Sequence, residues 1–107
     1  MIDVSAEHLA IIEKILLRRV PRAKVMAFGS RVAGNAVDYS DLDLAIEADG
    51  KLDLATLGNL KADFDDSEIP FRMDVLDFNA VSPEFREIIK SHCETILLPA
   101  ACQGEAK

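Results

Sequence analysis

Two short segments, residues 41–48 (DLDLAIEA) and 71–78 (FRMDVLDF), alternate apolar and polar side chains with a period of two. This period is typical of β-strands that are buried on one face, because successive side chains of a strand point to opposite sides of the sheet. A third segment, KVMAF at residues 24–28, is an apolar run that ends at Gly29 and also favours a strand. The chain is therefore expected to build a sheet with at least one covered face.

Helical segments surround these strands, and each begins with a recognisable signal. Ser5 precedes a segment with apolar residues at helical spacing, which a proline ends. Asp53 and the pair Ser82–Pro83 begin two later helices. We expect the last helix to carry its apolar stripe on through Cys93 and Ile96. The predicted order is α-β-β-α-β-α, an α/β (α+β) domain with a small mixed sheet backed by helices.

Length and patterning predict the domain organisation. The chain has 107 residues, half of them apolar, which is enough for one core and too short for two. We expect a single domain over residues 1–98 and a flexible C-terminal tail over residues 99–107, where the pattern of regular elements ends. Cys93 and Cys102 are too few for a disulfide framework or a four-ligand zinc site.

The charge balance narrows the classes of partner. The 12 basic and 19 acidic residues give a formal charge of −7, which argues against sequence-independent binding to a nucleic-acid backbone. A small anionic ligand stays possible if a metal ion carries the positive charge. No apolar run reaches the length that spans a bilayer, and the N-terminus lacks a basic start followed by an apolar stretch. A cytoplasmic protein without membrane contact is expected.

The alternation gathers acids on one face of the sheet. In residues 41–48 the leucines can face the helices, which leaves Asp41 and Asp43 together on the other, open face. Asp74 joins them if the later strand is a neighbour. Such carboxylates repel one another, yet they suit oxygen-preferring divalent ions, and neighbouring carboxyls can bridge two ions about 3.5 to 4 Å apart. By itself an acidic alternating strand is more often solvated, so this prediction depends on the combination.

A glycine-serine turn precedes the acids. Gly29 and Ser30 follow the first strand, where a glycine lets the backbone approach a ligand closely. Backbone amides from Arg31 to Ala33, at the start of a helical turn, and the serine hydroxyl can hold phosphate oxygens. The ten residues that separate this turn from Asp41 are enough to leave a phosphate-binding turn and return as an adjacent strand.

These motifs together resemble a known family. The pair Gly29–Ser30, the ten residues that follow, the run Asp41–Leu42–Asp43 and then Asp74 within MDVLDF are similar to the minimal nucleotidyltransferase (MNT) domain of the polymerase-β-like superfamily. The resemblance spans nearly the whole chain. It implies a magnesium-dependent transfer of a nucleoside monophosphate from a nucleoside triphosphate, with ATP foremost, to an acceptor hydroxyl with release of pyrophosphate.

The resemblance also assigns roles to individual residues. Those that would hold the triphosphate tail are Gly29, Ser30 and Arg31. Asp41 and Asp43 would bind the two metal ions, and Asp74 would help bind the ion that activates the acceptor hydroxyl and assist in its deprotonation. Members of the family frequently carry arginines where this chain has Ala33 and Val37, so the affinity for phosphate is open.

The same resemblance implies a partner. Minimal members pair with a helical HEPN-type protein in toxin-antitoxin modules, where the transferase modifies and neutralises the toxin. A homo- or hetero-oligomer is therefore possible. The alternative is a non-catalytic antitoxin subunit that neutralises its partner by occlusion. The base preference, the acceptor and the number of nucleotides added are left open by the sequence.

Overall fold

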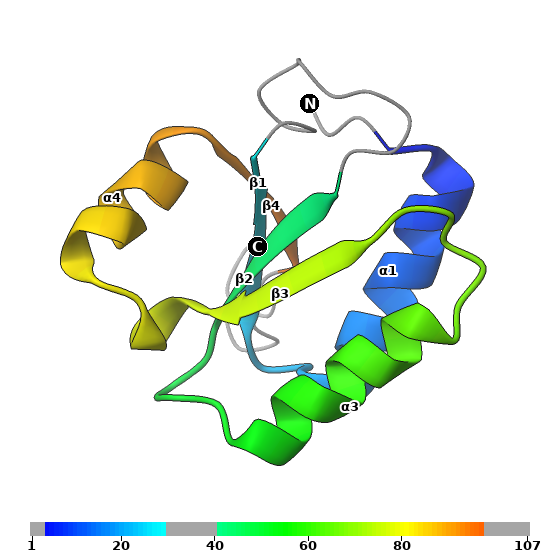
Figure 1. The fold of residues 1–107 in the computed structure, drawn as a ribbon, viewed down its shortest axis with the longest axis horizontal. Coiled ribbons are helices and arrows are strands. Elements are labelled where there is room, and N and C mark those ends of the chain that lie inside the picture. Colours follow the sequence, from blue (N-terminus) through cyan, green and yellow to red (C-terminus); the bar gives the residue numbers. More distant parts are fainter. Residues whose placement is uncertain (1–3, 30–40, 98–107) are drawn as a thin grey trace, which may run out of the picture.

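A four-stranded mixed sheet of order β3-β2-β1-β4 forms the centre of the protein (Figure 1). The computed structural model describes residues 4–29 and 41–97. The elements in chain order are α1 (Ala6–Arg19), β1 (Lys24–Phe28), β2 (Leu42–Glu47), α3 (Leu54–Asp65), β3 (Met73–Asp77), the short 3₁₀ turn η1 (Phe78–Ala80), α4 (Pro83–Ser91) and β4 (Cys93–Leu97). Strand β1 runs antiparallel to β2 and β4, and β2 runs parallel to β3. The predicted mixed α/β class is confirmed, as is the predicted order of elements through α4.

The three predicted helix starts are confirmed by their capping bonds. In each case the side-chain oxygen of the cap accepts a hydrogen bond from the backbone amide three residues later, which satisfies one of the free amides of the first turn. The pairs are Ser5 with His8, Asp53 with Thr56, and Ser82 with Phe85. The bond from Thr56 also lowers the pKa of the Asp53 carboxyl, because it favours the charged form.

The predicted continuation of the last helix is wrong. Helix α4 ends at Ser91, and Cys93–Leu97 forms strand β4 along the outer edge of β1. A stripe of apolar residues three or four apart does not distinguish a helix end from a short strand. Tertiary pairing decides between them here, since β4 satisfies the backbone groups along the free edge of β1. Leu97, at the end of β4, then reaches the core.

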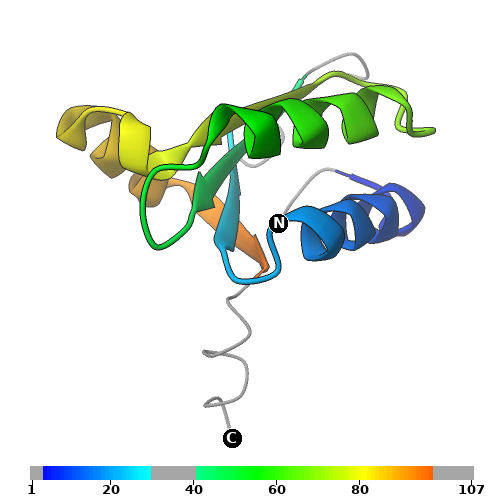
Figure 2. The ribbon, with the colours of Figure 1, turned by 90° about the horizontal axis from the view of Figure 1, so that it is seen from below.

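Helices α1 and α3 cover one face of the sheet, and α4 lies on the other side (Figure 2). The larger cluster of buried side chains lies between the sheet and the first two helices, and its fully buried members include Ile12, Leu16, Leu42, Leu44, Ile46 and Leu60. These include the β2 residues that the alternation predicted to face the helices. Burial of this apolar surface is the main driving force for the fold.

The opposite face, which carries the acids, is partly covered. A second cluster there joins Met26, Ala45, Phe78 and Ile89, with Leu76 packed against it. The prediction of a fully open acidic face is therefore wrong for the part of the sheet around Ala45. The chain leaves β3 through η1 and returns as α4, and this places Phe78 and Ile89 over the small side chain of Ala45.

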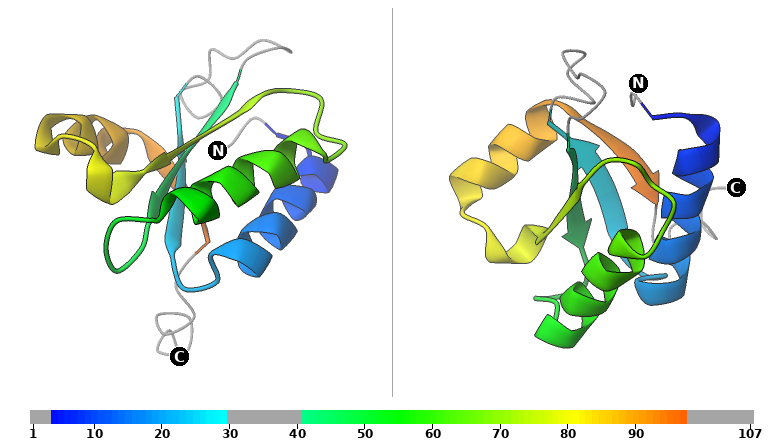
Figure 3. Two further views of the ribbon diagram at one scale, coloured as in Figure 1. Left: turned by 60° about the horizontal axis from the view of Figure 1, so that its bottom comes forward. Right: turned by 45° about the vertical axis from the view of Figure 1, so that its right-hand side comes forward.

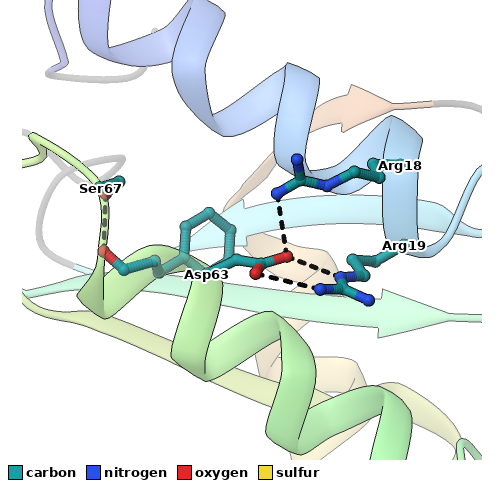
Figure 4. Close-up of polar contacts among 5 residues, drawn as sticks. Arg18, Arg19, Asp63 and Ser67 are labelled. Atoms are coloured by element: carbon teal, nitrogen blue, oxygen red, sulfur yellow. Dashed lines mark hydrogen bonds and ion pairs between the residues drawn. The ribbon is translucent and has the colours of Figure 1, made fainter.

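An ion-pair cluster joins α1 to α3 (Figure 4). Asp63 accepts hydrogen bonds from Arg19 at 2.6 Å (Nε to Oδ2) and 3.2 Å (Nη2 to Oδ1), and Nη2 of Arg18 lies 3.3 Å from Oδ2. These bonds, with that to Arg19 the strongest, lower the pKa of the Asp63 carboxyl. Two of the arginines that close the first helix therefore contact another helix.

Within the described part of the chain, no helix is both long enough and apolar enough to span a bilayer.

Buried Asp77 organises the connection from β2 to α3. Its carboxylate accepts hydrogen bonds from the backbone amides of Leu52 at 2.7 Å and Asn79 at 3.0 Å. The side-chain amide of Asn79 in turn donates to the carbonyl oxygens of Ala48 and Gly50, each at 3.0 Å. The loop that follows β2 is thus anchored to the end of β3 through polar groups that are satisfied within the fold.

Candidate active site

The two acidic strands are neighbours, as the site prediction required. In the parallel pairing of β2 with β3, Asp43 lies directly opposite Asp74. Side chains of residues in register on adjacent strands point to the same face of a sheet, so the two carboxyl groups stand side by side. Asp74 is exposed and Asp43 is half-buried. The acid of the later strand is therefore neither turned into the core nor remote from the earlier ones.

Asp43 is the electrostatic centre of the group. Its pKa is raised from 3.8 to about 6, first by burial, then by the charges of Asp74 and Asp41, and finally by a hydrogen bond with Asp74. All these causes act in one direction, because each disfavours a negative charge on Asp43. A shared proton or a cation between the carboxylates relieves the repulsion.

The donor set suits a hard divalent cation, although its geometry is not that of a closed metal site. Asp43 and Asp74 present carboxylate oxygens side by side, which are the ligands that magnesium and calcium prefer. Across residues 4–29 and 41–97, no three potential metal-binding side chains are gathered closely enough to hold an ion. Asp41 is exposed just before β2 and close enough to affect Asp43 electrostatically.

Gly29 brings the backbone at the end of β1 against the carboxylate of Asp43. Its φ of +86° lies in the region that L-residues with a side chain rarely adopt. A Cβ atom added at Gly29 would overlap Oδ2 of Asp43. The sequence predicts a close approach of this backbone to a ligand, whereas the group that it approaches in the structure is the carboxylate of Asp43. Its part in holding phosphate stays a prediction.

The rest of the predicted phosphate turn lies outside the described residues. This applies to Ser30 and Arg31, and to Ala33 and Val37, where the family frequently has arginines. The predicted tail over residues 99–107 and Cys102 are also outside them. The roles of Ser30 and Arg31 and the extent of the domain stay predictions.

A hollow adjoins the site that the sequence did not predict. It has a volume of about 390 Å³ and is lined by Phe28, Gly29, Phe85, Ile88, Ser91 and His92. Phe85 and Ile88 lie in α4 among apolar residues at helical spacing, which identifies a helix face but does not show that Ile88 is 63% exposed. The walls of the hollow come from β1 and α4, so the sequence could indicate it only once the position of α4 relative to β1 is known.

A second hollow, of about 340 Å³, lies away from the acids. Its lining includes Arg22, Lys51 and Thr56, at the opposite end of β2 from Asp43. Of the predicted catalytic and phosphate-binding residues that the structure describes, none lines it. Its position gives it no part in the chemistry of the aspartates, whereas the hollow beside Gly29 adjoins the candidate site.

Comparisons with known proteins agree with this geometry. The family model described as polymerase beta, nucleotidyltransferase, matches residues 11–98. A curated relative, the probable protein adenylyltransferase MntA of Haemophilus influenzae, is 48% identical over 89 residues, which cover 83% of this chain and 78% of the relative. The match thus includes every acid of the candidate site.

Solved structures share the fold. A crystal structure of a toxin-antitoxin complex with AMP-PNP superposes with a TM-score of 0.74 at 20% identity, over 91% of this chain and 78% of that one. A structure of the tri-AMPylated Shewanella oneidensis HEPN toxin with its MNT antitoxin gives a TM-score of 0.63 at 19% identity, with the same coverage. These likenesses show the fold, and the family match together with the 48% identical relative shows that the chain belongs to the polymerase-β nucleotidyltransferase family.

Proposed function

We propose that this nucleotidyltransferase moves AMP from ATP to a hydroxyl group of a HEPN-type partner protein, as the antitoxin of a toxin-antitoxin module. The observation that carries the proposal is the side-by-side placement of Asp43 and Asp74 next to the backbone of Gly29. The 48% identical relative is called a probable protein adenylyltransferase, and solved structures of similar fold include a HEPN toxin that carries AMP groups.

Asp41, Asp43 and Asp74 are the residues that would hold magnesium, with two ions expected. When bound, the metal neutralises the charge of the triphosphate and of the transferring phosphorus. The repulsion that raises the pKa of Asp43 supports this role, because a site of crowded carboxylates gains most from a cation. Binding then requires that Asp43 lose its proton.

In the proposed reaction the acceptor oxygen forms a bond to the α-phosphorus of ATP, and the bond to the bridging oxygen of the β-phosphate breaks. Pyrophosphate leaves with that electron pair. Asp74 is exposed on the sheet face and open to an incoming hydroxyl, so it accepts the acceptor's proton and passes it to water. Gly29 leaves room for the phosphate chain at the end of β1, where Ser30 and Arg31 would contact its oxygens.

The experiment combines the protein with the product of its neighbouring gene, magnesium and ATP labelled at the α-phosphate. We expect label on the partner protein, none when EDTA replaces magnesium, and strongly reduced label with Asp43→Asn or Asp74→Asn. Asp65→Asn is the matched control, because it removes an exposed acid of α3 remote from the site. Label that is undiminished in both site variants contradicts the proposal.

The same samples separate catalysis from occlusion. An antitoxin that acts only by covering its partner needs the fold and not the carboxylates. In that case the Asp43→Asn protein neutralises the partner as well as the wild type does, and no label is incorporated by either protein. Neutralisation is therefore measured alongside incorporation for each variant.

A further inference from the structure

The last turns of α4 lie near the end of β1 (Figure 3). The hollow beside Gly29 is lined by residues from both of these segments. Phe28 forms part of its lining and is the register partner of Asp43 in the β1–β2 pairing. The hollow therefore opens next to the acid pair, on the same face of the sheet. Its volume of about 390 Å³ falls within the usual range for small-molecule pockets, about 300 to 1,000 Å³.

The lining of this hollow suits a flat, uncharged group. Among the described residues that line it, none carries a carboxylate, ammonium or guanidinium group. The rings of Phe28 and Phe85 meet edge to face, with centroids 6.1 Å apart and planes at 82°. Ile88 adds an aliphatic wall that is 63% exposed. A phosphate finds no cationic side chain among these residues, whereas an aromatic heterocycle finds apolar and aromatic surfaces to pack against.

The rim provides polar groups for recognition. Ser91 donates its hydroxyl hydrogen to the carbonyl oxygen of Ile88 at 2.7 Å, and Nδ1 of His92 lies 3.4 Å from the same hydroxyl oxygen. The His92 ring is exposed at the mouth of the hollow and can exchange hydrogen bonds with the edge of a heterocycle. Apolar walls with a few polar groups at one edge are typical of pockets that bind small aromatic ligands.

We infer that this hollow is the subsite for the base of the nucleoside triphosphate. The inference rests on the proposed function, which places the phosphate chain at Gly29 and the transferring phosphorus at the acid pair. The nucleoside, which is attached to the transferring phosphorus, must then lie against a surface next to the acid pair. The hollow begins at Gly29 itself and is uncharged, and it offers aromatic and aliphatic walls where the base needs them. An apolar side chain of the partner protein is the competing occupant, and the experiment below distinguishes it.

Two ligands separate the base from the phosphates. AMP-PNP carries both parts, whereas inorganic tripolyphosphate carries only the phosphate chain. We measure the dissociation constant of each by titration calorimetry with magnesium present. Ile88→Ser removes the exposed aliphatic wall without adding charge, and Phe85→Leu removes an aromatic ring while leaving an apolar side chain. Leu17→Ser is the control, because Leu17 is 50% exposed on α1, across the sheet from α4.

We expect Ile88→Ser and Phe85→Leu to weaken AMP-PNP binding about tenfold, the loss typical of one removed base contact, and to leave tripolyphosphate binding unchanged. Leu17→Ser should bind both ligands as the wild type does. Wild-type affinity of Ile88→Ser for AMP-PNP overturns the inference. The inference is also overturned if Ile88→Ser weakens the binding of tripolyphosphate as much as that of AMP-PNP. If Ile88→Ser weakens only the binding of the partner protein, the inference is overturned as well, and the hollow is then a docking site for the partner.

Failure of the proposed function has a different signature. In that case the wild-type protein binds neither AMP-PNP nor tripolyphosphate, and the inference of a base subsite fails together with the proposed function. A wild type that binds both ligands and labels its partner, combined with an Ile88→Ser variant of unchanged affinity, overturns the base subsite alone. A urea unfolding curve for each variant confirms that the compared proteins are folded.

Discussion

Asp43 on β2 and Asp74 on β3 are direct register partners in a parallel pair, although a helix and two loops separate them in the chain. The sheet order explains why Asp43 is the central residue of the site. Strand β2 lies between β1, which ends at the glycine, and β3, which carries the second acid. Asp43 therefore meets the backbone of Gly29 on one side and the carboxyl group of Asp74 on the other.

Loss of one carboxylate should weaken cation binding. We expect Asp43→Asn to reduce the affinity for Mg²⁺ or Mn²⁺ by at least about tenfold, because an amide is a weaker and uncharged ligand. Titration calorimetry with Mn²⁺ on the protein without nucleotide measures this change. Asp65→Asn removes the same single negative charge from the protein and should bind the ion as the wild type does. Equal losses in the two variants would mean that only the overall charge matters.

The raised pKa of Asp43 predicts a pH dependence of stability in the metal-free protein. The folded protein holds a proton on Asp43 up to a pH of about 6, whereas the unfolded chain releases it near 3.8. Stability from this group is therefore fully present below pH 3.8 and is lost as the pH rises through 6. The Asp43→Asn protein carries no such titration, so its stability relative to the wild type should increase as the pH rises from 3.8 through about 6.

Urea unfolding in EDTA at a series of pH values tests this prediction. The quantity to follow is the difference in unfolding free energy between Asp43→Asn and the wild type, since other groups that titrate cancel in the difference. We expect this difference to grow with pH and to level off above 7. A difference that is constant with pH contradicts the proposed electrostatics of Asp43. Added Mg²⁺ should reverse the order of stability, because it binds the protein with the intact pair more tightly than it binds the variant.

Gly29→Ala should impair both the fold and the reaction. The φ of +86° costs an alanine about 1 to 2 kcal/mol, and the added Cβ overlaps the Asp43 carboxylate. The strand end or the acid must therefore move. We expect a lower unfolding free energy and at least about a hundredfold slower AMP transfer, since misplacement of about 1 Å can cost this much. Gly58→Ala is the control, because a Cβ at Gly58 in α3 meets nothing within 4 Å. Similar rates in the two variants would contradict the role of Gly29.

The elements and the acids could be predicted from the sequence because local signals determine them. Side-chain caps such as Asp53 mark helix starts, and a period of two marks β2. The same period assigned Asp43 and Asp74 to corresponding faces. That these strands are neighbours is a tertiary property, and it entered the prediction as a condition that the structure now meets.

The features that were missed depend on contacts between distant segments. Strand β4 is selected by the free edge of β1, which its own residues do not reveal. The cover over Ala45 and the hollow at Ile88 both follow from the path of α4 back across the sheet. Apolar spacing identifies a helix face, but it does not say how much of that face another element covers.

Substitution of Asp77 should lower the unfolding free energy more than substitution of an exposed acid does. Asp77 is 6% exposed and accepts hydrogen bonds from the amides of Leu52 and Asn79. Asp77→Ala leaves both donors without this acceptor, and we expect a loss of about 2 to 4 kcal/mol in unfolding free energy. Asp77→Asn keeps one acceptor oxygen and should lose roughly half as much. Asp65→Ala, in an exposed position of α3, should change the unfolding free energy by less than about 0.5 kcal/mol.

Urea unfolding of the three variants at one pH, with magnesium absent, provides the comparison. An Asp77→Ala protein as stable as Asp65→Ala would show that the loop after β2 is held by other contacts. Hydrogen exchange locates the effect, since the amide of Leu52 should lose protection in Asp77→Ala while amides in the centre of β1 keep theirs relative to global unfolding. Because Asp77 lies at the far end of β3 from Asp74, the folded fraction should still bind Mn²⁺ with wild-type affinity.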